Sequence, residues 1–255
     1  MEALLVSLSL RWSRLAVIVG LTPFFGSTQL PRLFRVAVAV SLTVLWWDTP
    51  TGGLGPTLTL LQQASSNAWL WGLLVAREVL IGLVLALAMR LLLVPARVAG
   101  EFIAQEMLLS FAAATHPGSD TPGTLLGQWF ELAVLVLFFS MDGHHLLLAV
   151  IHAAWINWPI GELSLWPGCD WQSGCRLVLH SGVQLALPVT ACLFLLGVGL
   201  ALLARAAPPL NLFSLGFVVR VLGGLVALYV FWPVLLVGLV QTLQNVSRWL
   251  AHYGG

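Results

Sequence analysis

Residues that could perform catalysis or bind a metal are few in this sequence, and they lie within long apolar stretches. The run Asp142–Gly143–His144–His145 offers a carboxylate and two imidazoles, which are common ligands of zinc. Adjacent histidines point to different faces of a helix and no HExxH pattern is present, so we do not expect a metal site. Ser110 and Ser140 lack a GxSxG turn and a matched base, which disfavours a hydrolase. The sequence therefore predicts neither an enzyme nor a bound cofactor.

Charged residues within the apolar stretches are the second chemically capable group. They are Arg11, Arg14, Arg77, Glu78, Arg90, Glu131, Asp142 and Arg220. Each costs at least ~2.5–3.5 kcal/mol if it faces lipid, so they predict protein neighbours. Arg77 and Glu78 are adjacent and are expected to point to different sides of one helix, each with its own partner. Interhelical ion pairing is the favoured interpretation, and the lining of an aqueous path is the alternative.

The composition indicates that membrane helices carry these residues. Hydrophobic residues make up 59% of the 255 residues and charged residues 8%, and the mean hydropathy is +0.96. Soluble domains are about half apolar and a quarter charged. A bilayer core requires ~20 apolar residues per helix. About six stretches approach that length, at roughly 4–25, 33–47, 68–94, 125–156, 177–204 and 210–247. We therefore predict an all-α integral membrane protein.

Two of these stretches have further features. The second, 33–47, is short, which suggests a helix that is partly buried by its neighbours or does not fully span the bilayer. The last stretch contains Gly223, Gly224 and Pro233, which predict a kink or a return as a hairpin. Arginines concentrate after the first, third and fifth stretches, which places those connections in the cytoplasm. The net charge of +1 provides no basic face for a nucleic acid. Cys169 and Cys175 either form a disulfide or remain free thiols.

The region between the third and fourth stretches is the most informative. Val98–Ala114 has helical character but carries Glu101, Gln105 and Glu106, and a Gly/Pro/Ser/Asp loop follows at His116–Gly123. A helix with these acids is poorly suited to lipid. It suits burial in protein or exposure to a water-filled lumen.

Five stretches in order resemble one family, the FliR/SctT export-gate proteins of flagellar and virulence type III secretion. They are TPFFGSTQLPRLFRVAVAVSL, REVLIGLVLALAMRLL, AGEFIAQEMLLSFAAATHPGSD, MDGHHLLL and ARAAPPLNLFSLGFVVRVLGGL, within about residues 14–230. The chain departs from the family at three places. His116–Pro117 replaces Asp-Pro, Pro209 replaces Gln, and Leu108 stands where the family tends to have Gly after the Met. MDGHHLLL and the LGF after Asn211 are similar to the flagellar branch, and INWPIGEL to the virulence branch.

The resemblance implies a fold of helical hairpins similar to a fusion of the smaller gate proteins, with a FliP-like part at about 1–156 and a FliQ-like part at about 157–255. It implies FliP-like and FliQ-like gate subunits and an FlhB-like switch protein as partners, with unfolded exported proteins as cargo. It also implies contact with lipid of the bacterial inner membrane, in a flagellar basal body or injectisome. The alternative is a self-standing transporter or channel, although no convincing internal repeat supports one.

The resemblance also implies site residues. The family has a loop that helps to plug the closed gate, which corresponds here to Met107–Asp120. The expected pore and plug residues are Met107, Leu108, Leu109, Phe111, Ala112, Ala113, Ala114, His116, Pro117, Gly118 and Asp120. Their apolar, small and flexible side chains suit a seal that yields to a polypeptide, and plain helix packing is the alternative. The expected buried polar or subunit contacts are Arg77, Glu78, Arg90, Glu101, Gln105, Glu106, Arg205 and Asn211.

Overall fold

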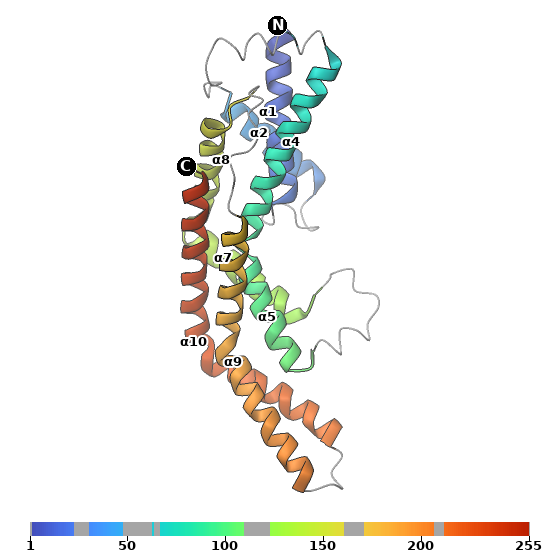
Figure 1. The fold of residues 1–255 in the computed structure, drawn as a ribbon, viewed down its shortest axis with the longest axis vertical. Helices are drawn as coiled ribbons and strands as arrows, with labels where there is room; N and C mark the ends of the chain where they lie inside the picture. Colours follow the sequence, from blue (N-terminus) through green and yellow to red (C-terminus); the bar gives the residue numbers. More distant parts are fainter. Residues whose placement is uncertain are drawn as a thin grey trace. The chain divides into compact units, whose positions relative to one another are not determined.

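The computed structural model of this chain describes residues 2–22, 31–47, 63, 67–109, 123–160, 171–206 and 212–254. Within these ranges all regular structure is helical, which confirms the all-α prediction (Figure 1). The helices are α1 (Glu2–Leu21), α2 (Arg32–Leu45), α4 (Ala68–Arg90), α5 (Val94–Glu106), α7 (Leu125–Ser140), α8 (Gly143–Asn157), α9 (Trp171–Ala206) and α10 (Leu212–Gly254).

Three of the described helices are long and apolar enough to cross a membrane. They are α4, α9 and the Gly216–Leu250 part of α10, and α7 with α8 would make a fourth if they form one broken span. These spans confirm a membrane protein, with fewer full crossings than the six apolar stretches suggest. The second stretch is short as expected, because α2 has only 14 residues.

One predicted boundary is wrong, and one open alternative is decided. The stretch 125–156 is two helices, because the backbone turns at Met141 and Asp142, where Asp142 has a φ of 56°. Of the two alternatives for the last stretch, the kink holds and the hairpin does not, because α10 continues for 43 residues through Pro233. A proline removes one backbone hydrogen bond, which bends a helix more readily than it reverses it. Figure 1 shows α10 changing direction along its length.

The chain forms two compact units that alternate along the sequence. Unit 1 contains Met1–Arg90, Asp142–Asp170 and Ser247–Gly255, and in it α1 packs against α4 and α2. Unit 2 contains Leu91–Met141 and Trp171–Val246, and in it α5 packs against α9 and α7.

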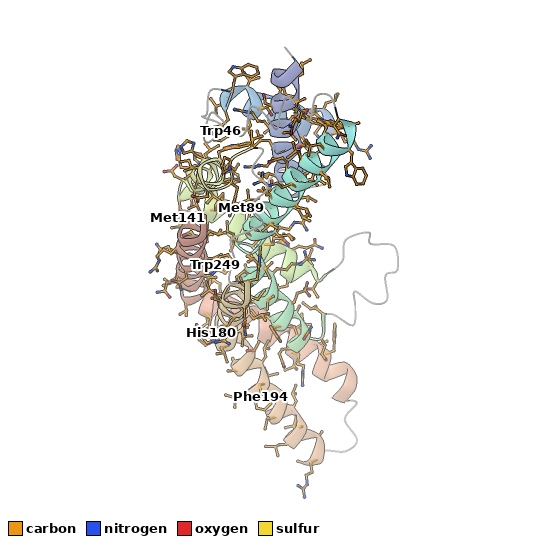
Figure 2. All side chains as sticks on the ribbon, turned by 45° about the horizontal axis from the view of Figure 1, so that its top comes forward. Trp46, Met89, Met141, His180, Phe194 and Trp249 are labelled. Carbon is orange, nitrogen blue, oxygen red and sulfur yellow. The ribbon has the colours of Figure 1, made fainter. Side chains whose placement is uncertain are left out.

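The long helices of unit 2 bury little of their apolar surface within the chain. Only 22% of the most apolar part of α9 is buried within the chain, and only 17% of the most apolar part of α10 is buried. Phe194 of α9 projects away from its helix and is 63% exposed (Figure 2). Tyr229 of α10 is 84% exposed. These faces therefore need lipid or other chains around them.

Candidate functional site

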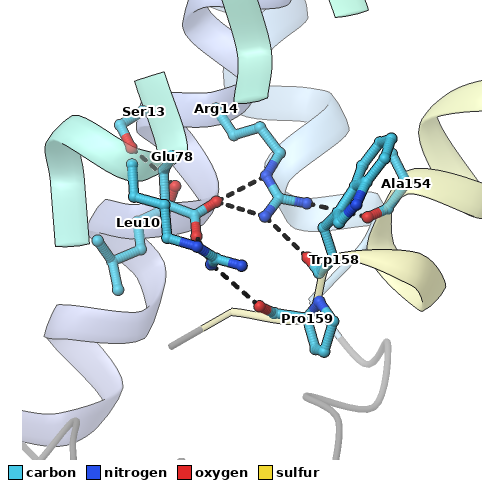
Figure 3. A network of polar contacts seen from close by, with 8 residues as sticks. Leu10, Ser13, Arg14, Glu78, Ala154, Trp158 and Pro159 are labelled. Atoms are coloured by element: carbon cyan, nitrogen blue, oxygen red, sulfur yellow. Dashed lines mark hydrogen bonds and ion pairs between the residues drawn. The ribbon is translucent and has the colours of Figure 1, made fainter. Parts of the chain in front are cut away.

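A buried ion cluster joins α1 to α4 in unit 1 (Figure 3). Arg14 of α1 is 0% exposed, and its Nε and Nη2 donate to Glu78 Oε2 at 2.6 Å and 2.5 Å. Glu78 of α4 is also 0% exposed, and its Oε1 accepts from Arg77 Nη1 at 2.9 Å. One carboxylate therefore serves two guanidinium groups. Buried charges persist in this form, paired and hydrogen-bonded.

The same cluster holds the C-terminal end of α8. Arg14 Nη1 donates to the carbonyl of Ala154 at 3.2 Å, and Nη2 donates to that of Trp158 at 2.9 Å. The guanidinium lies over the ring of Trp155, 4.2 Å from its centre. The last carbonyls of a helix have no partners within it, and a cation is favourable there. Arg14 therefore connects three helices, a role that sequence reasoning did not assign to it.

Arg77 and Glu78 each have a partner of their own, as expected, but they also pair with each other. The Glu78 carboxylate points into unit 1, whereas Arg77 lies nearer its surface, with a side chain 15% exposed. The long arginine side chain reaches from there both to Glu78 and to the carbonyl of Pro159, at 3.2 Å. Adjacent positions do point in different directions, but the reach of arginine compensates for this.

Three further arginines donate to carbonyls at or just beyond the ends of neighbouring helices. The donor and acceptor residues are Arg11 with Trp46 and Trp47, Arg90 with Leu21, and Arg220 with Glu106. Interhelical ion pairs also occur, among them Arg14–Glu78 and Arg97–Glu131. Ion pairing is thus only part of the explanation for charges in the apolar stretches. The sequence did not reveal the other part, which is the capping of helix ends.

In unit 2, the Glu101 side chain of α5 accepts a hydrogen bond at the start of α7. Its Oε1 accepts from the backbone N–H of Thr124 at 2.9 Å, and the Thr124 hydroxyl accepts from Gly127 N–H at 3.2 Å as a helix cap. The two helices approach closely at Gly100, where a Cβ would lie 2.7 Å from the Cα of Gly127. Glu101 is therefore an interhelical contact, and glycines permit the close approach of the two helices.

The predicted plug segment begins at the C-terminal end of α5. The structure describes its first three residues, Met107, Leu108 and Leu109. The others, Phe111, Ala112, Ala113, Ala114, His116, Pro117, Gly118 and Asp120, lie outside the described residues. Met107 is 1% exposed and lies over Gly224 of α10, where a Cβ would be 2.5 Å from Met107 Cγ. Met107 therefore anchors the segment within unit 2.

Leu108 has a left-handed backbone conformation. Its φ is 60°, and its N–H donates to the carbonyl of Gln105 at 3.0 Å, as in a helix that ends in a left-handed residue. This position favours glycine. A leucine costs roughly 1–2 kcal/mol in this conformation. Its side chain is 38% exposed.

The remaining predicted residues have different surroundings. Arg90 bonds to the end of α1, and Glu106 is half-buried and accepts from Arg220 through its backbone. Gln105 and Arg205 are exposed, and Asn211 lies outside the described residues. Cys175 is an exposed free thiol on α9, and Cys169 also lies outside them.

The residues Asp142, His144 and His145 lie closer together than expected. One ligand atom of each lies within 4.8 Å of the others, so the argument that adjacent histidines cannot converge is wrong. These residues form the first turn of α8, where the backbone at Asp142 is left-handed. All three side chains are exposed.

Comparisons with known proteins place these features in context. The family model described as bacterial export proteins, family 1, matches residues 5–246. The chain is 25% identical over 224 residues to the flagellar biosynthetic protein FliR of Escherichia coli K12, covering 87% of the chain and 82% of that protein. It is 26% identical over 238 residues to FliR of Bacillus subtilis, covering 88% of each. It is 26% identical over 153 residues to Yop proteins translocation protein T of Yersinia pestis, covering 58% of each.

Proposed function

This chain belongs to the FliR/SctT family, the bacterial export proteins of family 1, and we propose from that premise that it is a non-catalytic subunit that helps to form and plug an export pore. It is an inner-membrane component of the type III protein export apparatus, and its FliR relatives are flagellar biosynthetic proteins. The single observation that carries the proposal is the family match over residues 5–246.

The surface of the long helices supports a role within an assembly. α9 and α10 extend about 54 Å and 65 Å at ~1.5 Å per residue, which exceeds a bilayer core of ~30 Å. Only 22% and 17% of their most apolar parts are buried within the single chain. An apolar groove of about 730 Å³ also runs between α7 and α10, lined by Trp129, Tyr229 and Trp232 among others. Partner chains would cover surface that lipid alone does not reach.

FliP-like and FliQ-like gate subunits and an FlhB-like switch protein are the proposed partners, and unfolded exported proteins are the proposed cargo. In this proposal the two parts of the chain, about 1–156 and 157–255, stand in for one copy of each smaller subunit. The polar contacts at Arg77, Glu78 and Glu101 hold the chain in the shape that those partners meet.

The proposed plug is Met107–Asp120. Met107 supports it as a buried anchor, and the half-exposed Leu108 begins the part that is free to seal. An apolar seal excludes ions, because dewetted constrictions gate without fixed polar contacts.

Co-purification tests this function. A tagged chain would be expressed with its FliP-like and FliQ-like neighbours and examined by native mass spectrometry. We expect one defined complex that contains both partners. In liposomes this complex should retain potassium, and replacement of residues 112–118 by a Gly/Ser linker should release it. Recovery of a stable chain or homo-oligomer in place of that complex would contradict the proposal.

A further inference from the structure

Three side chains that can ligate a metal ion gather at the first turn of α8, within unit 1. Asp142 directly precedes the helix, and His144 and His145 are its second and third residues. One ligand atom of each side chain lies within 4.8 Å of those of the other two. The two imidazole rings have their centres 4.3 Å apart and their planes tilted by 37°. All three side chains are exposed, so their ligand atoms are open to an incoming ion.

The carboxylate of Asp142 lies with the two imidazoles and does not cap the helix. An Asp directly before a helix ordinarily accepts a hydrogen bond from the N–H of the second or third helical residue. The Asp142 side chain makes no such bond. The backbone turns here with a φ of 56°, and the carboxylate lies beside His144 and His145. Helix capping therefore does not account for the position of this carboxylate.

We propose that Asp142, His144 and His145 bind one divalent transition-metal ion, of which Zn²⁺ is the representative. Two imidazole nitrogens and one carboxylate oxygen are ligands that Zn²⁺ accepts readily. Mg²⁺ and Ca²⁺ prefer oxygen ligands alone, so this set of donors disfavours them. Three protein ligands leave a fourth position of the ion to water. The site does not depend on the export function proposed above.

Binding requires only small movements of the three side chains. In a tetrahedral zinc site with bonds of ~2.0–2.1 Å, the ligand atoms are about 3.3 Å apart. The present separations are at most 4.8 Å, so the ligand atoms need to approach one another by about 1.5 Å or less. Rotation about the side-chain bonds of exposed residues provides such a shift. Gly143, between Asp142 and the histidines, has no side chain to obstruct it.

The start of α8 opposes a cation only weakly. The partial positive charge at a helix N-terminus favours an anion and disfavours a cation. Asp142 supplies the anion, and its charge offsets part of the charge of the ion. The field of the helix is also screened by salt at an exposed position. Three direct bonds to the metal therefore outweigh it.

Isothermal titration calorimetry with ZnCl₂ tests the site on the full chain in detergent. The purification tag must contain no histidine. The thiols are alkylated before the titration, because Cys175 and Cys192 are exposed and thiolates also bind zinc. We expect one Zn²⁺ to bind per chain and an equal titration with MgCl₂ to show no binding.

Three substitutions remove one ligand each, and a fourth is the matched control. Loss of a residue that only supports a metal ligand commonly costs 10–100-fold in affinity. Asp142→Asn, His144→Ala and His145→Ala should therefore each weaken Zn²⁺ binding by at least about tenfold. Asn is also tolerated in the left-handed conformation of Asp142, so that variant keeps the turn. His152→Ala removes another exposed histidine of the same helix and should bind Zn²⁺ as the parent does.

Three results would overturn the site. They are the absence of Zn²⁺ binding by the parent chain, parental affinity in all three ligand variants, and an equal loss of affinity in His152→Ala. Circular dichroism of each variant first confirms that the helices are intact, so a loss of affinity reports on the ligands. No partner or cargo takes part in the titration. A negative result would therefore remove the metal site and leave the export function to its own test by co-purification.

Discussion

Replacement of Glu78 by glutamine tests whether charge stabilises the buried cluster of unit 1. The substitution nearly preserves shape but removes the negative charge between Arg14 and Arg77. Arg14 is 0% exposed, so water cannot replace the carboxylate that accepts from it at 2.5–2.6 Å. Removing one partner from a buried ion pair costs roughly 3–5 kcal/mol. We expect a loss of stability of that size.

The matched control is the same substitution at Glu131. Its Oε2 lies 3.5 Å from Arg97 Nη1, and the two side chains are 30% and 39% exposed. This pair is longer and only partly buried, and ion pairs that water reaches contribute about 0–1 kcal/mol because water screens the charges. Glu131→Gln should therefore change stability little, although the chemical change is identical.

Thermal unfolding of the detergent-solubilised complex measures the difference. A change of 1 kcal/mol shifts the midpoint by roughly 2–4 °C in a chain of this size, so Glu78→Gln should lower it by roughly 6–20 °C. Glu131→Gln should lower it by less than about 4 °C. Equal midpoints for the two variants would refute the reasoning, because burial would then make no difference to the pair.

Three other substitutions test the packing of unit 2 by the same assay. Gly100→Ala should destabilise the protein by about 1–3 kcal/mol, because its Cβ would lie 2.7 Å from the backbone of Gly127. Gly72→Ala is the control and should not destabilise it, because a Cβ there would have nothing within 4 Å. An equal effect at the two sites would contradict the close crossing of α5 and α7. Leu108→Gly should stabilise by about 1 kcal/mol, since it relieves a φ of 60°, and a loss of stability would argue against strain there. Thr124→Val should cost about 1 kcal/mol through loss of the helix cap, and an unchanged midpoint would show that the cap is not needed.

Composition and hydropathy predicted the membrane class and the approximate helices, because the apolar stretches are long. They did not predict the break at Asp142 or the continuity of α10. Asp142 takes a left-handed conformation that costs little in Asp, so no proline or long polar run signals the break. Pro233, by contrast, predicted either a kink or a hairpin, and the sequence did not decide between them. Packing of the surrounding helix outweighs one missing hydrogen bond.

The site was predictable by residue type and only partly by partner. The charged residues in apolar stretches were identified, and Glu101 does join two helices. The hydrogen-bond acceptors of the arginines were not predicted, because most are backbone carbonyls, which every residue has and which residue type therefore does not indicate. The departure at Leu108 was visible against the family pattern. Its meaning required the backbone angle that the structure provides.

Arginine side chains in this chain donate hydrogen bonds to the carbonyls that are left unpaired where helices end. A helix that ends among apolar side chains leaves carbonyls without hydrogen-bond partners, which is costly where water is absent. α1, α2, α5 and α8 each have carbonyls at or just beyond their C-terminal ends that accept from an arginine of another helix. One guanidinium offers five N–H donors, so it can satisfy a helix end and a carboxylate together, as Arg14 does. Short helices and intramembrane arginines are therefore two consequences of one architecture. An export subunit whose helices end within the assembly requires such donors, whereas a simple bundle of full-length spans would not.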